Sequence, residues 1–182
     1  MNLPNIISLA RLLSAPLGVW FILNHDLTGA FWLFVAAGLS DAVDGFIAKH
    51  FNQSSELGEL LDPIADKALI VSMTVTLGLA GYLPNWVVIL VVFRDILIVG
   101  GYLMALAVTR PLRWRPNAVS KLNTVLQIAL ITLVLAHLGL GLDDFGMTMP
   151  LALAVGVTTM LSGSLYLVRW MRVFAGAEEP GE

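Results

Sequence analysis

The sequence has no cysteine and little charge. Of its 182 residues, 13% are charged and 58% are hydrophobic, whereas soluble domains are about 25% charged. The absence of cysteine excludes disulfide bonds, thiolate metal sites and a cysteine nucleophile. Low charge and high hydrophobicity predict an integral membrane protein of one compact domain. Met1 to Asn5 carries no basic segment, so neither a cleavable signal nor an organelle transit peptide is expected.

The apolar residues are grouped into six long segments. Each is close to the roughly 20 residues that cross a bilayer, so we expect an all-α fold of six transmembrane helices. The segments lie near residues 4–24, 28–49, 58–81, 84–109, 118–140 and 147–172. We expect residues 1–174 to form the transmembrane domain and the acidic tail 175–182 to be disordered.

Lysine and arginine are segregated to one side of the predicted bundle. Six crossings place both termini on the same side, and that side carries Arg11, Lys49, Arg110, Arg113, Arg115, Lys121, Arg169 and Arg172. The short connectors expected on the other side have no Lys or Arg and carry Asp26, Asp143 and Asp144. The positive-inside rule therefore predicts cytoplasmic termini and a cytoplasmic active site, in the inner (plasma) membrane.

Four aspartates in the second and third segments are the most informative residues. Asp41, Asp44, Asp62 and Asp66 lie in apolar sequence, where an ionisable side chain is costly. An antiparallel hairpin would pair Asp44 with Asp62 and Asp41 with Asp66, about 6–12 Å below the loop. Spacings of three and four residues keep each pair on one helix face. Pro63 is expected in the first turn of the third helix, with Asp62 as its N-cap.

Four carboxylates this close need cations to balance their charge. Ligands that are all oxygen favour Mg²⁺, Mn²⁺ or Ca²⁺, and two such ions commonly clamp a phosphorus centre. The small residues Gly45, Ala48 and Gly58 would let a bulky group approach the helices. Structural hydrogen bonding by the aspartates and a cation-coupled carrier are the alternatives. Carriers usually show broken helices in two corresponding halves, and no such pairing is visible here.

The pattern Asp41-x2-Asp44-Gly45-x2-Ala48-Lys49-x8-Gly58-x3-Asp62-x3-Asp66 resembles the signature of the CDP-alcohol phosphotransferases in residue type and spacing. One position departs from it, because the family usually has Arg where Lys49 stands. Lysine keeps the charge but not the bidentate fork toward a phosphate. The segment from Pro4 to Arg11 resembles the start of phosphatidylglycerophosphate and cardiolipin synthases. The resemblance covers nearly the whole chain, since this family has six transmembrane helices, and it suggests a homodimer.

The resemblance implies that CDP-diacylglycerol gives its phosphatidyl group to an alcohol and that CMP leaves. Asp41, Asp44 and Asp62 would hold two Mg²⁺ or Mn²⁺ ions, and Asp66 would be the general base or a further ligand. The donor would be bound by Asn5, Ser8, Arg11, Gly45, Ala48, Lys49 and Gly58. The acceptor expected is phosphatidylglycerol, giving cardiolipin; glycerol 3-phosphate, as in phosphatidylglycerophosphate synthases, is the alternative. No nucleic acid is expected as a partner.

Two arginines within the segments each have two interpretations. Arg11 either extends to the membrane interface, as long basic side chains do, or contacts the donor phosphate. Arg94 either forms a neutralising internal pair with its neighbour Asp95 or binds the acceptor phosphate.

Lys121 begins the fifth segment and is the second candidate for the acceptor. Its spacing from Thr124 and Gln127 predicts that the three side chains share a helix face. The alternative is that Lys121 anchors the helix at the membrane interface.

Overall fold

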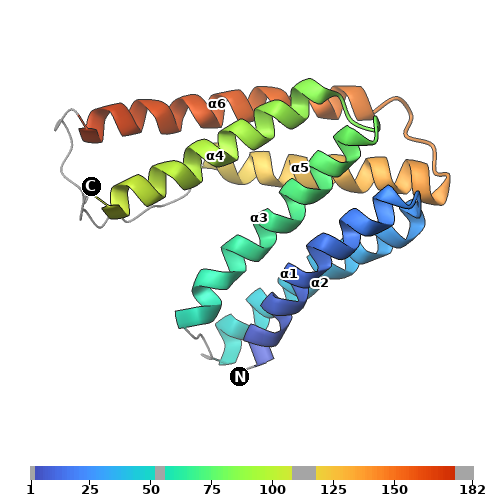
Figure 1. Ribbon diagram of the computed structural model, residues 1–182, viewed down its shortest axis with the longest axis horizontal. Coiled ribbons are helices and arrows are strands. Elements are labelled where there is room, and N and C mark those ends of the chain that lie inside the picture. The colour runs from blue at the N-terminus through green and yellow to red at the C-terminus, as the bar shows by residue number, and fades with distance from the viewer. Residues whose placement is uncertain (1–2, 52–55, 108–117, 175–182) are drawn as a thin grey trace. The chain divides into compact units, whose positions relative to one another are not determined.

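The computed structural model describes the backbone of residues 3–51, 56–107 and 118–174 and the side chains of 10–40, 66–101, 118–168 and 170–171. The regular elements of this part are all helices, joined by short connectors (Figure 1). These residues form six helices: α1 (Leu3–Leu23), α2 (Leu27–Phe51), α3 (Glu56–Leu79), α4 (Asn85–Ala107), α5 (Ala118–Leu140) and α6 (Thr148–Phe174). The predicted all-helical class and the six segments are therefore confirmed for this part of the chain. The tail 175–182 lies outside it, and the domain boundary at residue 174 stays a prediction.

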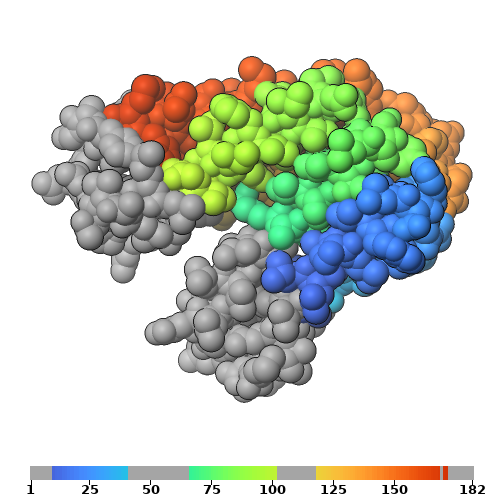
Figure 2. All heavy atoms as spheres, viewed as in Figure 1, coloured from blue at the N-terminus to red at the C-terminus, as the bar shows by residue number. Residues whose placement is uncertain are grey.

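The chain divides into two compact units, and the first contains residues 1–83 and 131–148. Within it, α1 packs against both α2 and α3, and the surfaces of α1 and α3 touch in Figure 2. Gly18 permits this approach, because a Cβ there would lie 2.7 Å from the sulfur of Met73. Ile22, Met73 and Leu77 are fully buried, so this unit is held together mainly by apolar packing.

The connectors of the first unit use sharp helix ends. His25, Gly81 and Gly141 have positive φ angles of 59°, 80° and 68°, the left-handed conformation that commonly ends a helix. At the start of α2, Asp26 accepts a hydrogen bond from the amide of Gly29 at 2.9 Å, as an N-cap does. These local signals reverse the chain within a few residues.

Three connectors meet at one end of the first unit. Thr28 donates a 2.6 Å hydrogen bond to the carbonyl of Gly139, and the His25 ring lies 3.3 Å from the Tyr82 hydroxyl. A Cβ on Gly139 would lie only 2.6 Å from the carbonyl oxygen of Leu27, so α2 and α5 approach closely there. The start of α1, the end of α2 and the start of α3 lie at the opposite end of this unit (Figure 1).

The second unit contains residues 84–130 and 149–182. Its helices also approach at glycines: Trp86 packs at 2.5 Å from the Cβ position of Gly156, and Trp170 fills the Cβ position of Gly101. Both contacts join α4 and α6, so these two helices approach closely.

Two helical segments, Ala118–Leu140 and Thr148–Val168, are long and apolar enough to cross a membrane among the described residues. Ala10–Leu23 and Leu27–Ser40 are shorter apolar helical segments. Large apolar side chains are exposed on every helix, as shown by Trp20, Trp32, Leu79, Ile89, Val125 and Leu153. A surface of this kind is unusual for a soluble protein.

Candidate functional site

The four aspartates lie on the two helices that flank residues 52–55. Asp41 and Asp44 are in the last turns of α2, and Asp62 and Asp66 are in the first turns of α3. At about 1.5 Å per residue, Asp44 and Asp62 are each about 10 Å from the helix end, and Asp41 and Asp66 about 15 Å. The predicted pairing by depth therefore agrees with the helix bounds. The pairs lie deeper than expected, because both helices extend further toward the connector.

The prediction for Pro63 is wrong. The third helix begins at Glu56, so Pro63 lies inside α3 and Asp62 is not its N-cap. A proline inside a helix removes one hydrogen bond of the ladder, and α1 also contains such a residue at Pro16. Asp62 and Asp66 consequently belong to one continuous helix, and their spacing of four residues keeps them on one face.

Asp66 is the one aspartate of the four whose side chain the structure describes, and it is half-buried. The side chains of Asp41, Asp44 and Asp62 lie outside the described residues. The same holds for most of the predicted donor-binding residues: Asn5 and Ser8 on α1, Gly45, Ala48 and Lys49 on α2, and Gly58 on α3. Their roles stay predictions that rest on the motif.

Arg11 on α1 is the predicted donor-binding residue whose side chain is described. It is only 3% exposed, so it does not extend along the surface toward water. α1 packs against both helices that carry the aspartates. A buried cation in this unit is compatible with a role near a phosphate, and the surface interpretation of Arg11 does not hold.

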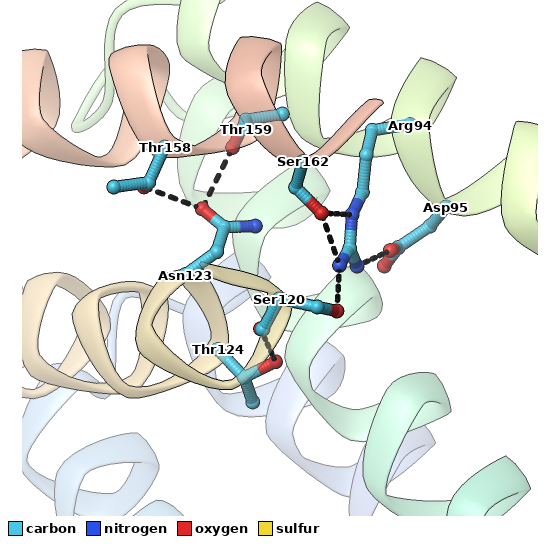
Figure 3. A network of polar contacts seen from close by, with 8 residues as sticks. All are labelled: Arg94, Asp95, Ser120, Asn123, Thr124, Thr158, Thr159 and Ser162. Atoms are coloured by element: carbon cyan, nitrogen blue, oxygen red, sulfur yellow. Dashed lines mark hydrogen bonds and ion pairs between the residues drawn. The ribbon is translucent and has the colours of Figure 1, made fainter. Parts of the chain in front are cut away.

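Arg94 is the centre of a polar network in the second unit (Figure 3). Its guanidinium binds Asp95 at 2.6 Å and the Ser162 hydroxyl at 3.0 Å, and it also donates to the Ser120 hydroxyl. The Tyr166 ring lies 5.9 Å from the guanidinium carbon. The network therefore joins α4, α5 and α6 through one buried cation.

The Arg94 contacts bear on its two interpretations. The guanidinium nitrogens Nε, Nη1 and Nη2 all donate within the protein, and the side chain is only 3% exposed. An acceptor phosphate would have to displace Asp95 or a serine hydroxyl. The structure therefore favours the neutralising internal pair, and acceptor binding by Arg94 stays a prediction.

Lys121, Thr124 and Gln127 do not share a face. Lys121 is exposed, Thr124 is half-buried and donates to the Ser120 carbonyl at 3.2 Å, and Gln127 is buried. Six residues turn a helix by about 600°, so Lys121 and Gln127 point roughly 120° apart. Lys121 is therefore accessible from outside the bundle, and Gln127 is a core residue.

Asn123 is a network residue that sequence reasoning missed. It is fully buried on α5, and its amide oxygen lies 2.8 Å from the Thr158 hydroxyl and 2.9 Å from that of Thr159 (Figure 3). The available signal was polar residues recurring every three or four positions on α5, at Ser120, Asn123 and Gln127. In an apolar helix such a stripe indicates contact with polar groups on a neighbouring helix.

The donor set of the aspartate positions fits a hard divalent cation. All four motif positions supply carboxylate oxygens, which suit Mg²⁺, Mn²⁺ or Ca²⁺ better than soft metals. Among the described side chains, no group of three acidic or histidine residues gathers. The fit therefore rests on the chemistry of the four positions and on their matched places along α2 and α3.

The chain belongs to the CDP-alcohol phosphatidyltransferase family. The family model of that description matches residues 1–163, which include α1 to α5, all four aspartates and most of α6. The resemblance drawn from the motif is thereby confirmed.

Several curated proteins are similar to this chain. A cardiolipin synthase (CMP-forming) / mitochondrial hydrolase fusion protein of Schizosaccharomyces pombe is 34% identical over 92% of this chain and 31% of its own length. A chloroplastic CDP-diacylglycerol–glycerol-3-phosphate 3-phosphatidyltransferase of Oryza sativa is 31% identical over 95% and 58%. A cardiolipin synthase (CMP-forming) of Rattus norvegicus is 33% identical over 74% and 50%. The chain thus spans between 31% and 58% of the length of these relatives.

Proposed function

We propose that this protein is a membrane-embedded enzyme that transfers the phosphatidyl group of CDP-diacylglycerol to phosphatidylglycerol, which gives cardiolipin and CMP. One observation carries the proposal. The complete aspartate motif of the family falls on two helices, α2 and α3, at matched distances from the segment that joins them. Two relatives named above are cardiolipin synthases that form CMP.

Asp66 is proposed to act as the general base. It would take the proton of the acceptor hydroxyl as that oxygen forms a bond to the phosphatidyl phosphorus. The bond between this phosphorus and the oxygen of CMP breaks, and CMP leaves with the electron pair. Asp66 is half-buried on α3, and a carboxylate held at the site is a suitable acceptor for a hydroxyl proton.

Asp41, Asp44 and Asp62 are proposed to hold two Mg²⁺ or Mn²⁺ ions. Asp66 follows Asp62 closely in the motif and would be a further ligand. When bound, such ions would neutralise the diphosphate of the donor and polarise its phosphorus. Room for the cytidine and diphosphate would be left by the small residues Gly45, Ala48 and Gly58. Hydrogen-bond donors to the phosphate oxygens would come from Asn5, Ser8, Arg11 and Lys49. The burial of Arg11 supports this role, because a desolvated guanidinium binds phosphate strongly.

The choice between the two acceptors rests on position rather than on charge, since both candidates carry a phosphate. Lys121 is exposed at the start of α5, where it can meet the phosphodiester of a lipid that approaches from the bilayer. Glycerol 3-phosphate is the second candidate, and the similarity to the Oryza sativa enzyme supports it. Arg94 is a weaker acceptor candidate than Lys121, because its donors are already used by Asp95, Ser120 and Ser162.

We also propose that all six helices cross the membrane. Their lengths of 21 to 27 residues correspond to about 31–40 Å, enough for a hydrocarbon core of about 30 Å. The connectors 24–26, 80–84 and 141–147 contain no Lys or Arg. This absence supports an orientation with these connectors outside and with the aspartates near the cytoplasmic face of the inner (plasma) membrane. A homodimer is proposed from the family resemblance alone.

The test is a paired assay of purified protein in mixed micelles with Mg²⁺. One arm contains CDP-diacylglycerol and phosphatidylglycerol, and the other CDP-diacylglycerol and glycerol 3-phosphate; CMP and lipid products are measured by mass spectrometry. We expect CMP and a four-chain lipid in the first arm and little product in the second, with Asp44→Asn inactive in both. Product from glycerol 3-phosphate alone would identify a phosphatidylglycerophosphate synthase. No CMP with any alcohol would refute the proposed reaction.

A further inference from the structure

The connector between α5 and α6 presents an aromatic side chain outward. Phe145 is 85% exposed, more than any other large apolar residue among those described. Its φ angle is 50°, in the left-handed region that bulky side chains rarely adopt. A residue held in this conformation indicates that the surrounding contacts fix the connector.

The first half of the connector is fixed to the end of α5. Gly141 has a φ of 68°, and the amide of Leu142 donates to the carbonyl of Ala136 at 3.4 Å, the pattern that closes a helix with a left-handed residue. His137 Nδ1 lies 2.7 Å from the carbonyl oxygen of Leu142. The path of the chain after α5 is therefore defined by one left-handed glycine and two contacts.

The carboxylates of Asp143 and Asp144 fix the second half of the connector between α5 and α6. Asp143 accepts a hydrogen bond from the amide of Phe145 at 3.1 Å, and Asp144 accepts from the amide of Gly146 at 3.0 Å and the Thr148 hydroxyl at 2.8 Å. The Gly146 and Thr148 hydrogen bonds hold the pKa of Asp144 below its usual value. Both carboxylates accept hydrogen bonds from their own connector, and Asp143 is exposed beside the apolar side chains.

The exposed apolar residues of this connector continue those of the helix before it. Leu138 and Leu140 are exposed in the last turn of α5, followed by Leu142, Phe145 and Met147. Among the residues that the structure describes, α5 is one of two helices that are apolar and long enough to cross a membrane. No Lys or Arg lies between residues 136 and 149, so this connector offers no permanent cation to an anionic partner. The continuous apolar surface fits the lipid that surrounds α5.

We propose that the tip formed by Leu142, Phe145 and Met147 inserts into the boundary between headgroups and acyl chains of the leaflet at this end of the protein. The inference rests on the proposed membrane embedding and adds a defined lipid-contacting element to it. Asp143 and Asp144 stay at the headgroup level, where their charge is solvated. Burial of the Phe145 ring in lipid compensates for its left-handed backbone, since apolar surface leaves water.

The absence of cysteine from the natural sequence allows a direct test. Phe145→Cys, Asn24→Cys and Val125→Cys are each labelled with a nitroxide in the full-length protein and placed in phosphatidylcholine vesicles. Asn24 is an exposed polar residue of the α1–α2 connector in the same unit, and Val125 is 60% exposed on α5. Collision of each label with oxygen, which concentrates in lipid, and with a water-soluble nickel chelate is measured by electron paramagnetic resonance. Release of CMP by each labelled protein checks that it is folded.

We expect the ratio of oxygen to nickel collisions for the label at position 145 to be several times that at position 24 and to approach that at position 125. Equal ratios at positions 145 and 24, with the label at position 125 in lipid, would refute the tip insertion and leave the membrane enzyme intact. An immobilised label at position 145 that neither reagent reaches would show a protein partner or a second copy instead, and would also overturn it. A water-exposed label at position 125 would refute the membrane embedding itself.

Discussion

Replacement of Arg94 by leucine should strongly destabilise the protein. The substitution removes the guanidinium that lies 2.6 Å from Asp95, so the carboxylate of this residue, which is 7% exposed, loses that ion pair. Breaking one partner of a buried pair costs about 3–5 kcal/mol. For a chain of this size that corresponds to a fall in Tm of roughly 6–20 °C.

Two further variants separate the charge from the hydrogen bonds. Arg94→Lys keeps a cation near Asp95 but loses the planar fork that also reaches Ser120 and Ser162, so its Tm should lie between those of the native protein and Arg94→Leu. Adding Asp95→Asn to Arg94→Leu removes the buried charge that lost this ion pair and should recover at least half of the lost stability. Tm is measured in one detergent by intrinsic tryptophan fluorescence.

A native Tm for Arg94→Leu, or a double variant as unstable as Arg94→Leu, would show that the Arg94–Asp95 pair does not stabilise the protein. The same proteins also separate the two roles of Arg94. An internal pair alone predicts that the double variant keeps a near-native KM for phosphatidylglycerol, whereas acceptor binding predicts a KM raised by about tenfold or more, as loss of a charged hydrogen bond would cause.

EDTA should abolish CMP release, and Mg²⁺ or Mn²⁺ should restore it better than Ca²⁺, whose looser geometry positions oxygen ligands less well; full activity in metal-free buffer would contradict the proposed metal site. Asp66→Asn should lower kcat by roughly 10²–10⁴ with donor binding kept, whereas Asp44→Asn should lose metal binding and activity together, as calorimetry and turnover assays can show. Lys121→Ala should raise the KM for phosphatidylglycerol more than that for CDP-diacylglycerol, with Lys121→Arg near native; equal effects on both would argue for an interface anchor. Gly139→Ala should lower stability by about 1–3 kcal/mol, because the new Cβ meets the backbone of α2; Gly100→Ala, whose Cβ has no atom within 4 Å, is the matched control in the same Tm assay.

The helices could be predicted from the sequence because long apolar runs leave few alternatives. All six were located within a few residues. In the structure, Gly81 and Gly141 at positive φ and Asp26 as an N-cap stand at the connectors. The end of α2 and the start of α3 were less predictable. The polar residues near the connector suggested that α2 ends earlier, and Pro63 suggested that α3 begins later. In the structure α2 continues to Phe51 and α3 begins at Glu56. Local turn signals cannot report the tertiary packing that overrides them.

The site was predictable to different degrees. The aspartate motif is local in sequence, so its spacing alone gave the pairing by depth along α2 and α3. The surroundings of Arg94 could not be predicted from the sequence, because Ser120 and Ser162 come from other helices and only packing brings them together. Asn123 was missed for the same reason, since its partners lie 35 and 36 residues away.

The joined connectors of the first unit make one end of it a pivot. Thr28 to Gly139 and His25 to Tyr82 connect the chain reversals there, while the aspartates occupy the far turns of α2 and α3. With 24 residues, α3 is a lever of about 36 Å, and a tilt of about 5° at the pivot moves its first turn by roughly 3 Å. A rotation too small to break those hydrogen bonds would thus change the separation of the helix turns that carry the aspartates by several ångströms, without any large rearrangement of the fold.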